Sequence, residues 1–154
     1  MAEQHRGRHG QGRGGPDHQS RGASIELGAI VLKPPEGGHL DPELFDRTAR
    51  AVADKIAENQ RGNKPAQIRQ FYEELVMWEE RARMNPQSFD EFLPFMRMLN
   101  AKAAYAEGRQ NVDANFKALM AHCLGQVDDP ASLRNFKLFF EAFLGFYKLV
   151  GPKG

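Results

Sequence analysis

The spacing of apolar residues is the feature that most constrains the fold of this chain. From residue 40 onward, apolar residues recur every three or four positions, which is the spacing of one face of an α-helix. No segment there alternates between apolar and polar residues as a half-buried strand would. Proline and glycine divide the pattern into pieces, with proline near the starts and glycine at the ends. The sequence therefore predicts an all-α protein, a compact bundle of about five helices.

The predicted helix boundaries follow from these prolines and glycines and from the capping residues beside them. Asp41-Pro42 and Asp129-Pro130 each supply an N-cap residue followed by a proline in the first helical position, and Asp113 can cap the fourth helix. Ser88 begins a pattern typical of a capping box, but Pro94 would break a helix interior. We therefore expect one short turn after Ser88 and a third helix that begins at Pro94. The predicted helices span about residues 42–58, 65–82, 94–107, 114–124 and 130–150.

The N-terminal part has a different composition. Residues 1–22 contain no Ile, Leu, Val, Phe, Tyr or Trp, so they have too little apolar surface to offset the entropy of ordering. The apolar run Ile25 to Leu32 is short and is followed by Pro-Pro and Gly-Gly pairs; it is interpreted as a linker, with a lone strand or a docking peptide as alternatives. The expected organisation is a disordered Gly/Arg-rich tail and linker over residues 1–37, followed by a helical bundle domain over residues 38–154.

Composition narrows the class of protein. The N-terminus lacks the apolar core of a signal peptide, and no run approaches the length of a membrane span, so we expect a cytoplasmic protein with no membrane partner. The single cysteine, Cys123, excludes an internal disulfide. The net charge is +1, and residues 38–154 carry 16 basic and 16 acidic residues. Any affinity of the bundle for nucleic acid must therefore come from local clusters of charge.

The last predicted helix is apolar around most of its circumference. Its main stripe contains Leu133, Phe136, Phe140, Phe143, Leu144 and Tyr147. The far side carries a second apolar set, which includes Phe139 and Phe146. Such a helix is either central to its own domain or covered by a neighbouring chain, and in the second case Phe139 and Phe146 are the expected subunit contacts.

Catalytic chemistry is not predicted. His122 is the only histidine beyond residue 39, and it is adjacent to Cys123 in a helical pattern, where neighbouring side chains point about 100° apart. The other histidines lack the spacing of a metal site on a helix, and no glycine-rich phosphate loop occurs. We expect a protein that is not an enzyme and that has no metal and no cofactor.

Basic and polar residues near helix ends are the remaining candidates for a site. Lys64, Gln67 and Arg69 surround the predicted start of the second helix, where free N–H groups and the helix dipole favour a phosphate. A second set, distributed along and just past the third helix, consists of Arg97, Lys102 and Arg109. The alternative is that both sets are ordinary solvated helix faces. Arg-Gly pairs in the tail are similar to RNA-binding segments, although the tail has only four arginines.

Three sequence blocks carry a family resemblance. They are residues 67–72 (QIRQFY), residues 93–109 (LPFMRMLNAKAAYAEGR) and residues 135–148 (NFKLFFEAFLGFYK). In this order the blocks resemble the small subunit of type III-A CRISPR effector complexes, and they cover most of residues 63–150.

The resemblance implies a non-catalytic subunit of a complex that interferes with invading nucleic acid under the direction of a guide RNA. Several copies would stack as a short filament along the guide and target RNA, beside the backbone and large subunits that carry out RNA cleavage, DNA cleavage and cyclic oligoadenylate synthesis. Each copy would contact target RNA phosphates independently of base sequence. The implied partners are target RNA, the guide RNA complex, those subunits and copies of the chain itself.

The resemblance also suggests individual site residues. Gln67 and Arg69 match polar positions of the first motif, and three residues match basic positions of the second: Arg97, Lys102 and Arg109. Lys64 departs from the family, which often has threonine or serine around positions 64–66. The alternative function is a helical protein-interaction adaptor that holds a partner through Phe139 and Phe146 without contacting nucleic acid.

Overall fold

The computed structural model describes residues 25–153, and this part of the chain contains five α-helices and no strand. This arrangement confirms the predicted fold class. The expected disordered tail, residues 1–22, lies outside the described residues. The helices are α1 (Ala49–Ala57), α2 (Pro65–Met84), α3 (Phe89–Gly108), α4 (Ala114–Leu124) and α5 (Pro130–Val150).

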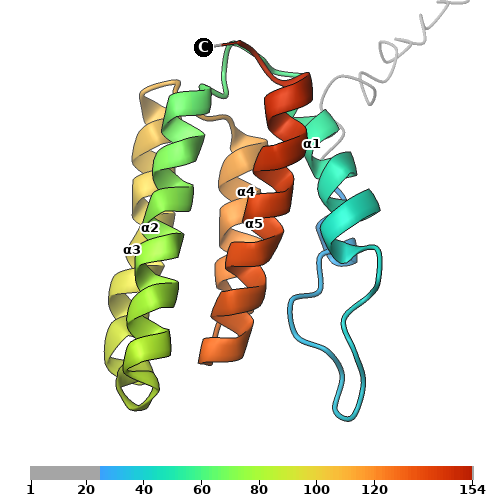
Figure 1. Cartoon of the computed structure of the whole chain (residues 1–154). Helices are drawn as coiled ribbons and strands as arrows, with labels where there is room; N and C mark the ends of the chain where they lie inside the picture. The colour runs from blue at the N-terminus through green and yellow to red at the C-terminus, as the bar shows by residue number, and fades with distance from the viewer. Residues whose placement is uncertain (1–24, 154) are drawn as a thin grey trace, which may run out of the picture.

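The last helix, α5, occupies the centre of the bundle. It packs against α1 on one side and against α2 on the other, and Figure 1 shows α4 behind it. The outer helix α3 packs against α2 and α4. The sequence allowed two interpretations of the apolar last helix, and the structure supports the first, in which the helix is central to its own domain.

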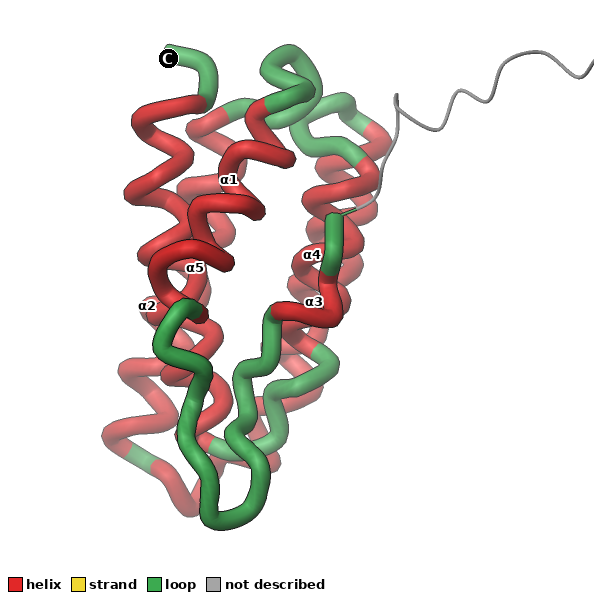
Figure 2. The backbone as a smooth tube through the Cα atoms, turned by 90° about the vertical axis from the view of Figure 1, so that its right-hand side faces the viewer, coloured by secondary structure: helices red, strands yellow, loops and turns green. Residues whose placement is uncertain are grey.

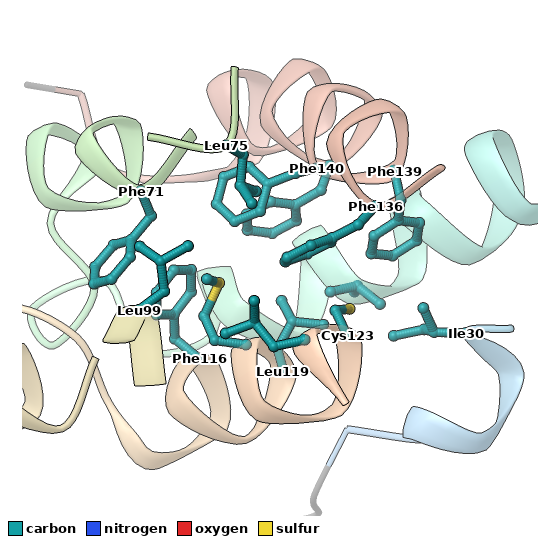
Figure 3. Close-up of a cluster of buried hydrophobic side chains, with 14 of the residues drawn as sticks. Ile30, Phe71, Leu75, Leu99, Phe116, Leu119, Cys123, Phe136, Phe139 and Phe140 are labelled. Carbon is teal, nitrogen blue, oxygen red and sulfur yellow. The ribbon is translucent and has the colours of Figure 1, made fainter. Parts of the chain in front are cut away.

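Phenylalanines of α5 form the middle of the core. The ring of Phe140 lies 6.2 Å from that of Phe116 on α4 and 5.4 Å from that of Phe143, in edge-to-face arrangements. Figure 3 shows Phe136 and Phe139 beside it, facing side chains of α4. Each fully buried phenylalanine contributes about 1.5–3 kcal/mol relative to an exposed one, so these rings account for much of the bundle's stability.

Two aspartates begin helices as predicted. The Oδ1 atom of Asp113 accepts a hydrogen bond from the N–H of Phe116 at 2.9 Å, and that of Asp129 accepts one from the N–H of Ser132 at 2.7 Å. The Ser132 hydroxyl in turn accepts from the N–H of Asp129, which completes a capping box. The bonds to Asp113 and Asp129 each satisfy an N–H group that has no partner within its helix.

The first helix differs from the prediction in its opening. Residues Leu44–Thr48 form a wider π-helical turn, in which the N–H of Thr48 donates to the carbonyl of Glu43 at 3.0 Å, and the regular α-helix begins only at Ala49. The side chain of Asp41, the predicted N-cap, does accept a hydrogen bond from the N–H of Glu43. This turn buries Leu44 completely.

The predicted start of the third helix was wrong. The helix α3 begins at Phe89 directly after a 3-10 turn, Pro86–Ser88, and Ser88 makes no side-chain cap. Pro94 lies inside the helix, where its missing N–H leaves the carbonyl of Asp90 without an intrahelical donor. Both residues are exposed, so water can hydrate that carbonyl, and the helix continues through the proline.

The segment before the bundle also differs from its interpretation as a linker. Ile30 and Leu32 are 1% and 0% exposed and belong to the same core as the helices, and Ile25 is buried as well. Figure 2 shows this segment running alongside α4. Residues 25–33 therefore fit the alternative interpretation, a docking peptide. The side chain of Gln126, which binds their main chain, lies more than 90 positions later in the chain.

Candidate nucleic-acid interface

Asn63, in the loop between α1 and α2, organises one end of the bundle. This side chain is 0% exposed. Its Nδ2 donates to the carbonyls of Ile56 at 3.2 Å and Asn59 at 3.3 Å, and its Oδ1 accepts from the N–H of Asp113 at 2.9 Å. One amide therefore joins the end of α1 to the start of α4 and fixes the loop that precedes α2.

Tyr147 connects the same loop to α5. Its hydroxyl donates a hydrogen bond of 2.6 Å to the carbonyl of Asn63. Burial, with a smaller contribution from the charge of Asp113, raises the pKa of Tyr147 to about 12. The phenol therefore stays protonated, as its role as a donor requires.

These contacts hold the start of α2 at the surface. Lys64 occupies the N-cap position with an extended backbone and makes no side-chain cap, and Pro65 follows in the first helical position. The N–H of Lys64 donates to the carbonyl of Asn111 at 2.9 Å, which joins this start to the loop after α3. The N–H groups of Ala66 and Gln67 in the first turn of α2 have no acceptor within the helix, so they give this surface a partial positive charge.

Six exposed cations surround this helix start, and we call them the basic end. The set lies where α2 begins and where α3 and α5 end, at the top of the molecule in Figure 1. Its members are Arg61, Lys64, Arg69, Arg109, Lys148 and Lys153.

The cations of the basic end form few ion pairs. Among the described residues, only Arg69 of the six has a carboxylate within 4.0 Å, that of Glu73 at 3.6 Å. The nearby Glu107 is paired with Lys117 at 2.9 Å, and Asp113 caps α4 and accepts from Asn59 at 3.1 Å. Glu107 and Asp113 line the same hollow as Arg61, Lys64 and Arg109 and lower its net positive charge, but they form no direct ion pair with these cations, whose charged groups stay accessible to an external anion.

Two hollows give the basic end its shape. One, of about 520 Å³, lies between loops and is lined by three cations and two acids, namely Arg61, Lys64, Arg109, Glu107 and Asp113. The other, of about 890 Å³, is a groove between the start of α2 and the end of α5. Arg69 lines the α2–α5 groove together with Lys148 and Lys153, and its apolar lining residues are Pro65, Ala66, Leu144, Leu149 and Pro152. The groove thus combines three cations with an apolar floor.

The structure brings together only some of the residues predicted from the sequence. Lys64 and Arg109 line the same hollow, and Arg109 is held over the ring of Tyr105, with its guanidinium 5.7 Å from the ring centroid. Gln67 contacts the same region, because its Oε1 accepts from Asn111 at 3.2 Å. Arg69 lies in the adjoining α2–α5 groove.

Lys102 lines a different groove from Lys64, Arg69 and Arg109, and it shares that groove, between α2 and α3, with Gln67. Its Nζ is 2.5 Å from a carboxylate oxygen of Glu74 on α2, and both residues line a shallow groove between the two helices. Three exposed apolar side chains share this flank of α3, namely Phe95, Met98 and Tyr105. Lys102 is therefore neutralised by its ion pair.

Arg97 is separated from the other predicted residues. It is exposed and follows the buried Met96, whereas Lys102 precedes the buried Ala103. At 100° per residue, these offsets place Arg97 and Lys102 on opposite flanks of α3. The flank of Lys102 faces α2, and the flank of Arg97 is the one on which Glu107 pairs with Lys117 of α4.

Three members of the basic end were missed by the sequence prediction: Arg61, Lys148 and Lys153. Lys148 is in the last turn of α5, and Lys153 follows it. They come close to Arg69 only because the end of α5 lies beside the start of α2. A weak signal existed, since a cation in a last helical turn is favoured near free carbonyls.

The two expected subunit contacts on α5 differ in burial, which corrects the prediction for Phe139 and leaves that for Phe146 a prediction. Phe139 is 1% exposed, because α1 and the other helices of this chain already surround α5, so it has no surface to offer a neighbouring chain. Phe146 is partly buried, and the guanidinium of Arg50 lies 4.9 Å from its ring centroid. Nothing in these positions favours the adaptor alternative.

The one cysteine shows no sign of reactivity. Cys123 is fully buried, and burial raises the pKa of its thiol, so the thiol stays protonated. The neighbouring His122 contacts the carbonyl of Ile30 at 2.9 Å. Within residues 25–153, no group of three or more His, Cys, Asp or Glu residues is placed to hold a metal ion. No described helix combines the length and apolar character that crossing a bilayer requires.

Comparison with protein families gives one match. The model of the family described as Csm2 Type III-A matches residues 39–153, which includes all five helices and the whole basic end. Neither the curated proteins nor the solved structures contain a match.

Proposed function

Because the chain belongs to the Csm2 Type III-A family, the small subunits of type III-A CRISPR interference complexes, we propose that its basic end contacts the phosphates of target RNA. Several copies would stack along the guide and target RNA beside the backbone and large subunits. In this role the chain supports binding, and the chemistry belongs to other subunits.

The observation that carries this proposal is the set of unpaired cations around an uncapped helix start. Arg61, Lys64 and Arg109 line one hollow together with Glu107 and Asp113, and among the described residues none of the three cations has a carboxylate within 4.0 Å. The free N–H groups at the start of α2 add a partial positive charge at the same place. Phosphate is the group on RNA that this combination attracts.

The α2–α5 groove supports a single-stranded ligand. Its cations can follow a sugar–phosphate backbone, while its apolar floor, with Leu149 83% exposed, offers contact to bases or riboses. Contacts of this kind are largely indifferent to base identity. They suit a subunit that must accept whatever sequence the guide selects.

Gln67 and Lys102 remain weaker proposals, since Gln67 is engaged with Asn111 and Lys102 with Glu74. Arg97 is a separate proposal because it lies on the other flank of α3. Arg97→Ala alone should reduce RNA affinity if a second contact runs along that flank.

The test removes charge from the basic end within the assembled complex. Lys64→Ala with Arg109→Ala should weaken target RNA binding roughly tenfold or more, equally for unrelated target sequences. The plot of log affinity against log salt should become shallower by about 1.4, since each lost single-strand phosphate contact removes about 0.7. Filter binding over a range of salt measures both quantities.

Arg83→Ala with Arg134→Ala is the matched control. Both arginines are exposed, have no carboxylate within 4.0 Å among the described residues, and lie at the opposite ends of α2 and α5 from the basic end. The control removes the same charge and should leave the affinity and its salt dependence unchanged. Equal effects of the two pairs would reject the basic end as the contact surface.

A further inference from the structure

Residues 25–33, which we call the strap, are bound to the bundle as a peptide ligand would be. The strap precedes residue 39, where the match to the family begins, so it is an addition to the part of the chain that the family describes. It contains one short 3-10 helix, Leu27–Ala29, followed by an extended stretch that contacts His122 of α4 and Asn135 near the start of α5.

The strap is recognised through its main chain. Gln126, which follows α4, accepts from the N–H of Leu32 at 2.8 Å and donates to the carbonyl of Ile30 at 2.9 Å. Asn135 on α5 donates to the carbonyl of Leu32 at 2.9 Å. Two side-chain amides therefore bind three main-chain groups of an extended segment.

Alternate side chains of the strap fill the site. Ile30 and Leu32 are 1% and 0% exposed, while Val31 between them is 48% exposed, which is the alternation of an extended chain against a surface. Figure 3 shows Ile30 near Cys123 of α4. At the C-terminal end of the strap, Lys33 forms an exposed ion pair with Asp128. The site thus selects an extended segment with two apolar anchors followed by a cation.

The connection between strap and bundle is long and weakly attached. Residues 34–43 are mostly exposed, contain Pro34 and Pro35, and turn at Gly37, whose φ is +73°. Twelve positions separate Leu32 from Leu44, enough to span about 40 Å when extended. A strap on this connection can reach a site well beyond its own α4.

We propose that the strap site is an exchangeable docking site, which takes the strap of a neighbouring copy when copies stack in the complex. This inference rests on the proposed function, which places several copies side by side. The strap makes the same contacts in either copy, so exchange loses no hydrogen bond or anchor, and the high local concentration of copies in a stack favours it. Each exchanged strap then ties two copies together.

Cross-linking between distinguishable copies tests the exchange. One copy carries Lys33→Cys and the other carries Asp128→Cys, with different N-terminal epitope tags, and both are co-expressed with the remaining subunits and guide RNA. Both positions are exposed, with side chains 45% and 56% accessible, so neither change disturbs the core. The native Cys123 is buried and does not compete for the reagent. A short, cleavable bis-maleimide is added to the purified complex.

Exchange predicts a cross-linked species that carries both tags. Placing Lys33→Cys and Asp128→Cys in the same copy provides the reference for a strap docked in its own bundle. A species with one tag only, together with cross-linking of the double variant within single chains, would overturn the proposal. Loss of guide RNA and backbone subunits from the pull-down would instead reject the proposed function, and the exchange with it.

A locked strap separates exchange from simple proximity of neighbouring copies. The double variant is cross-linked as a free protein, which fixes each strap in its own site, and is then supplied to a complex that lacks this subunit. We expect fewer copies per complex, measured by quantitative mass spectrometry, and recovery once the spacer is cleaved by reductant. Normal copy number with locked straps would show that exchange does not hold copies together.

Discussion

The helices α5 and α3 are nearly equal in length, 21 and 20 residues, but they place their aromatic side chains in opposite environments. Phe139 and Phe143 of α5 are 1% and 0% exposed, whereas Phe95 and Tyr105 of α3 are 59% and 66% exposed. The difference lies in their neighbours, because α5 is surrounded by α1, α2 and α4, while α3 packs only along one stripe against α2 and α4. Position in the bundle, rather than apolar content, decides which rings stabilise the fold.

Truncating one ring on each helix is the strongest test of this contrast. Phe139→Ala should lower the free energy of unfolding by about 3–5 kcal/mol, because it removes a buried ring and leaves a cavity. Phe95→Ala should change it by less than about 0.5 kcal/mol. Urea denaturation followed by circular dichroism measures both. A large loss from Phe95→Ala would mean that the outer flank of α3 is covered in solution.

Replacing the proline inside α3 tests whether this residue lowers the stability of the helix. Pro94→Ala restores an N–H that can donate to the carbonyl of Asp90, so we expect the free energy of unfolding to rise by about 1–3 kcal/mol. Pro86→Ala is the control, because Pro86 starts a 3-10 turn where its N–H would have no helical partner. If the two variants behave alike, the proline does not weaken α3.

The two tyrosines extend the comparison to polar groups. Tyr147→Phe on α5 leaves the carbonyl of Asn63 without its donor and should lower the free energy of unfolding by about 1–2 kcal/mol at neutral pH. Tyr105→Phe on α3 should have almost no effect, since its hydroxyl is exposed and contacts only Arg109. Thermal and urea unfolding at pH 7 compare the two.

The pH dependence provides a second measurement on Tyr147. Its pKa is raised from 10.0 to about 12 in the folded protein, so between these pH values the unfolded state releases its proton first. The stabilisation is complete below pH 10 and is lost as the pH rises towards 12. The wild type should therefore lose its advantage over Tyr147→Phe in this range, and a constant difference would contradict the raised pKa.

The fold could be predicted largely from local chemistry. Asp113 and Asp129 cap their helices as expected, because an N-cap depends on residues only three positions away. The expectation for Phe139 failed because its burial depends on α1, a helix more than 80 positions earlier in the sequence. A helical wheel shows that a face is apolar but not which neighbour covers it.

The candidate site was predicted in part for the same reason. Lys64 and Arg69 stand beside a recognisable helix start, so their place in the basic end could be predicted from the sequence. Lys148 and Lys153 join them only through the packing of α5 against α2. The strap was underestimated because Gln126 and Asn135, which bind it, are more than 90 positions away and carry no local signature of peptide recognition.

The central position of α5 has a consequence for synthesis on the ribosome. Translation produces α1 to α4 first, and until α5 leaves the exit tunnel these helices have no partner for the apolar sides that α5 covers. Most of the nascent chain must therefore wait with exposed hydrophobic surface, and folding completes in one late step. A ribosome that stalls after Gly125 would release a product prone to aggregation and to capture by chaperones.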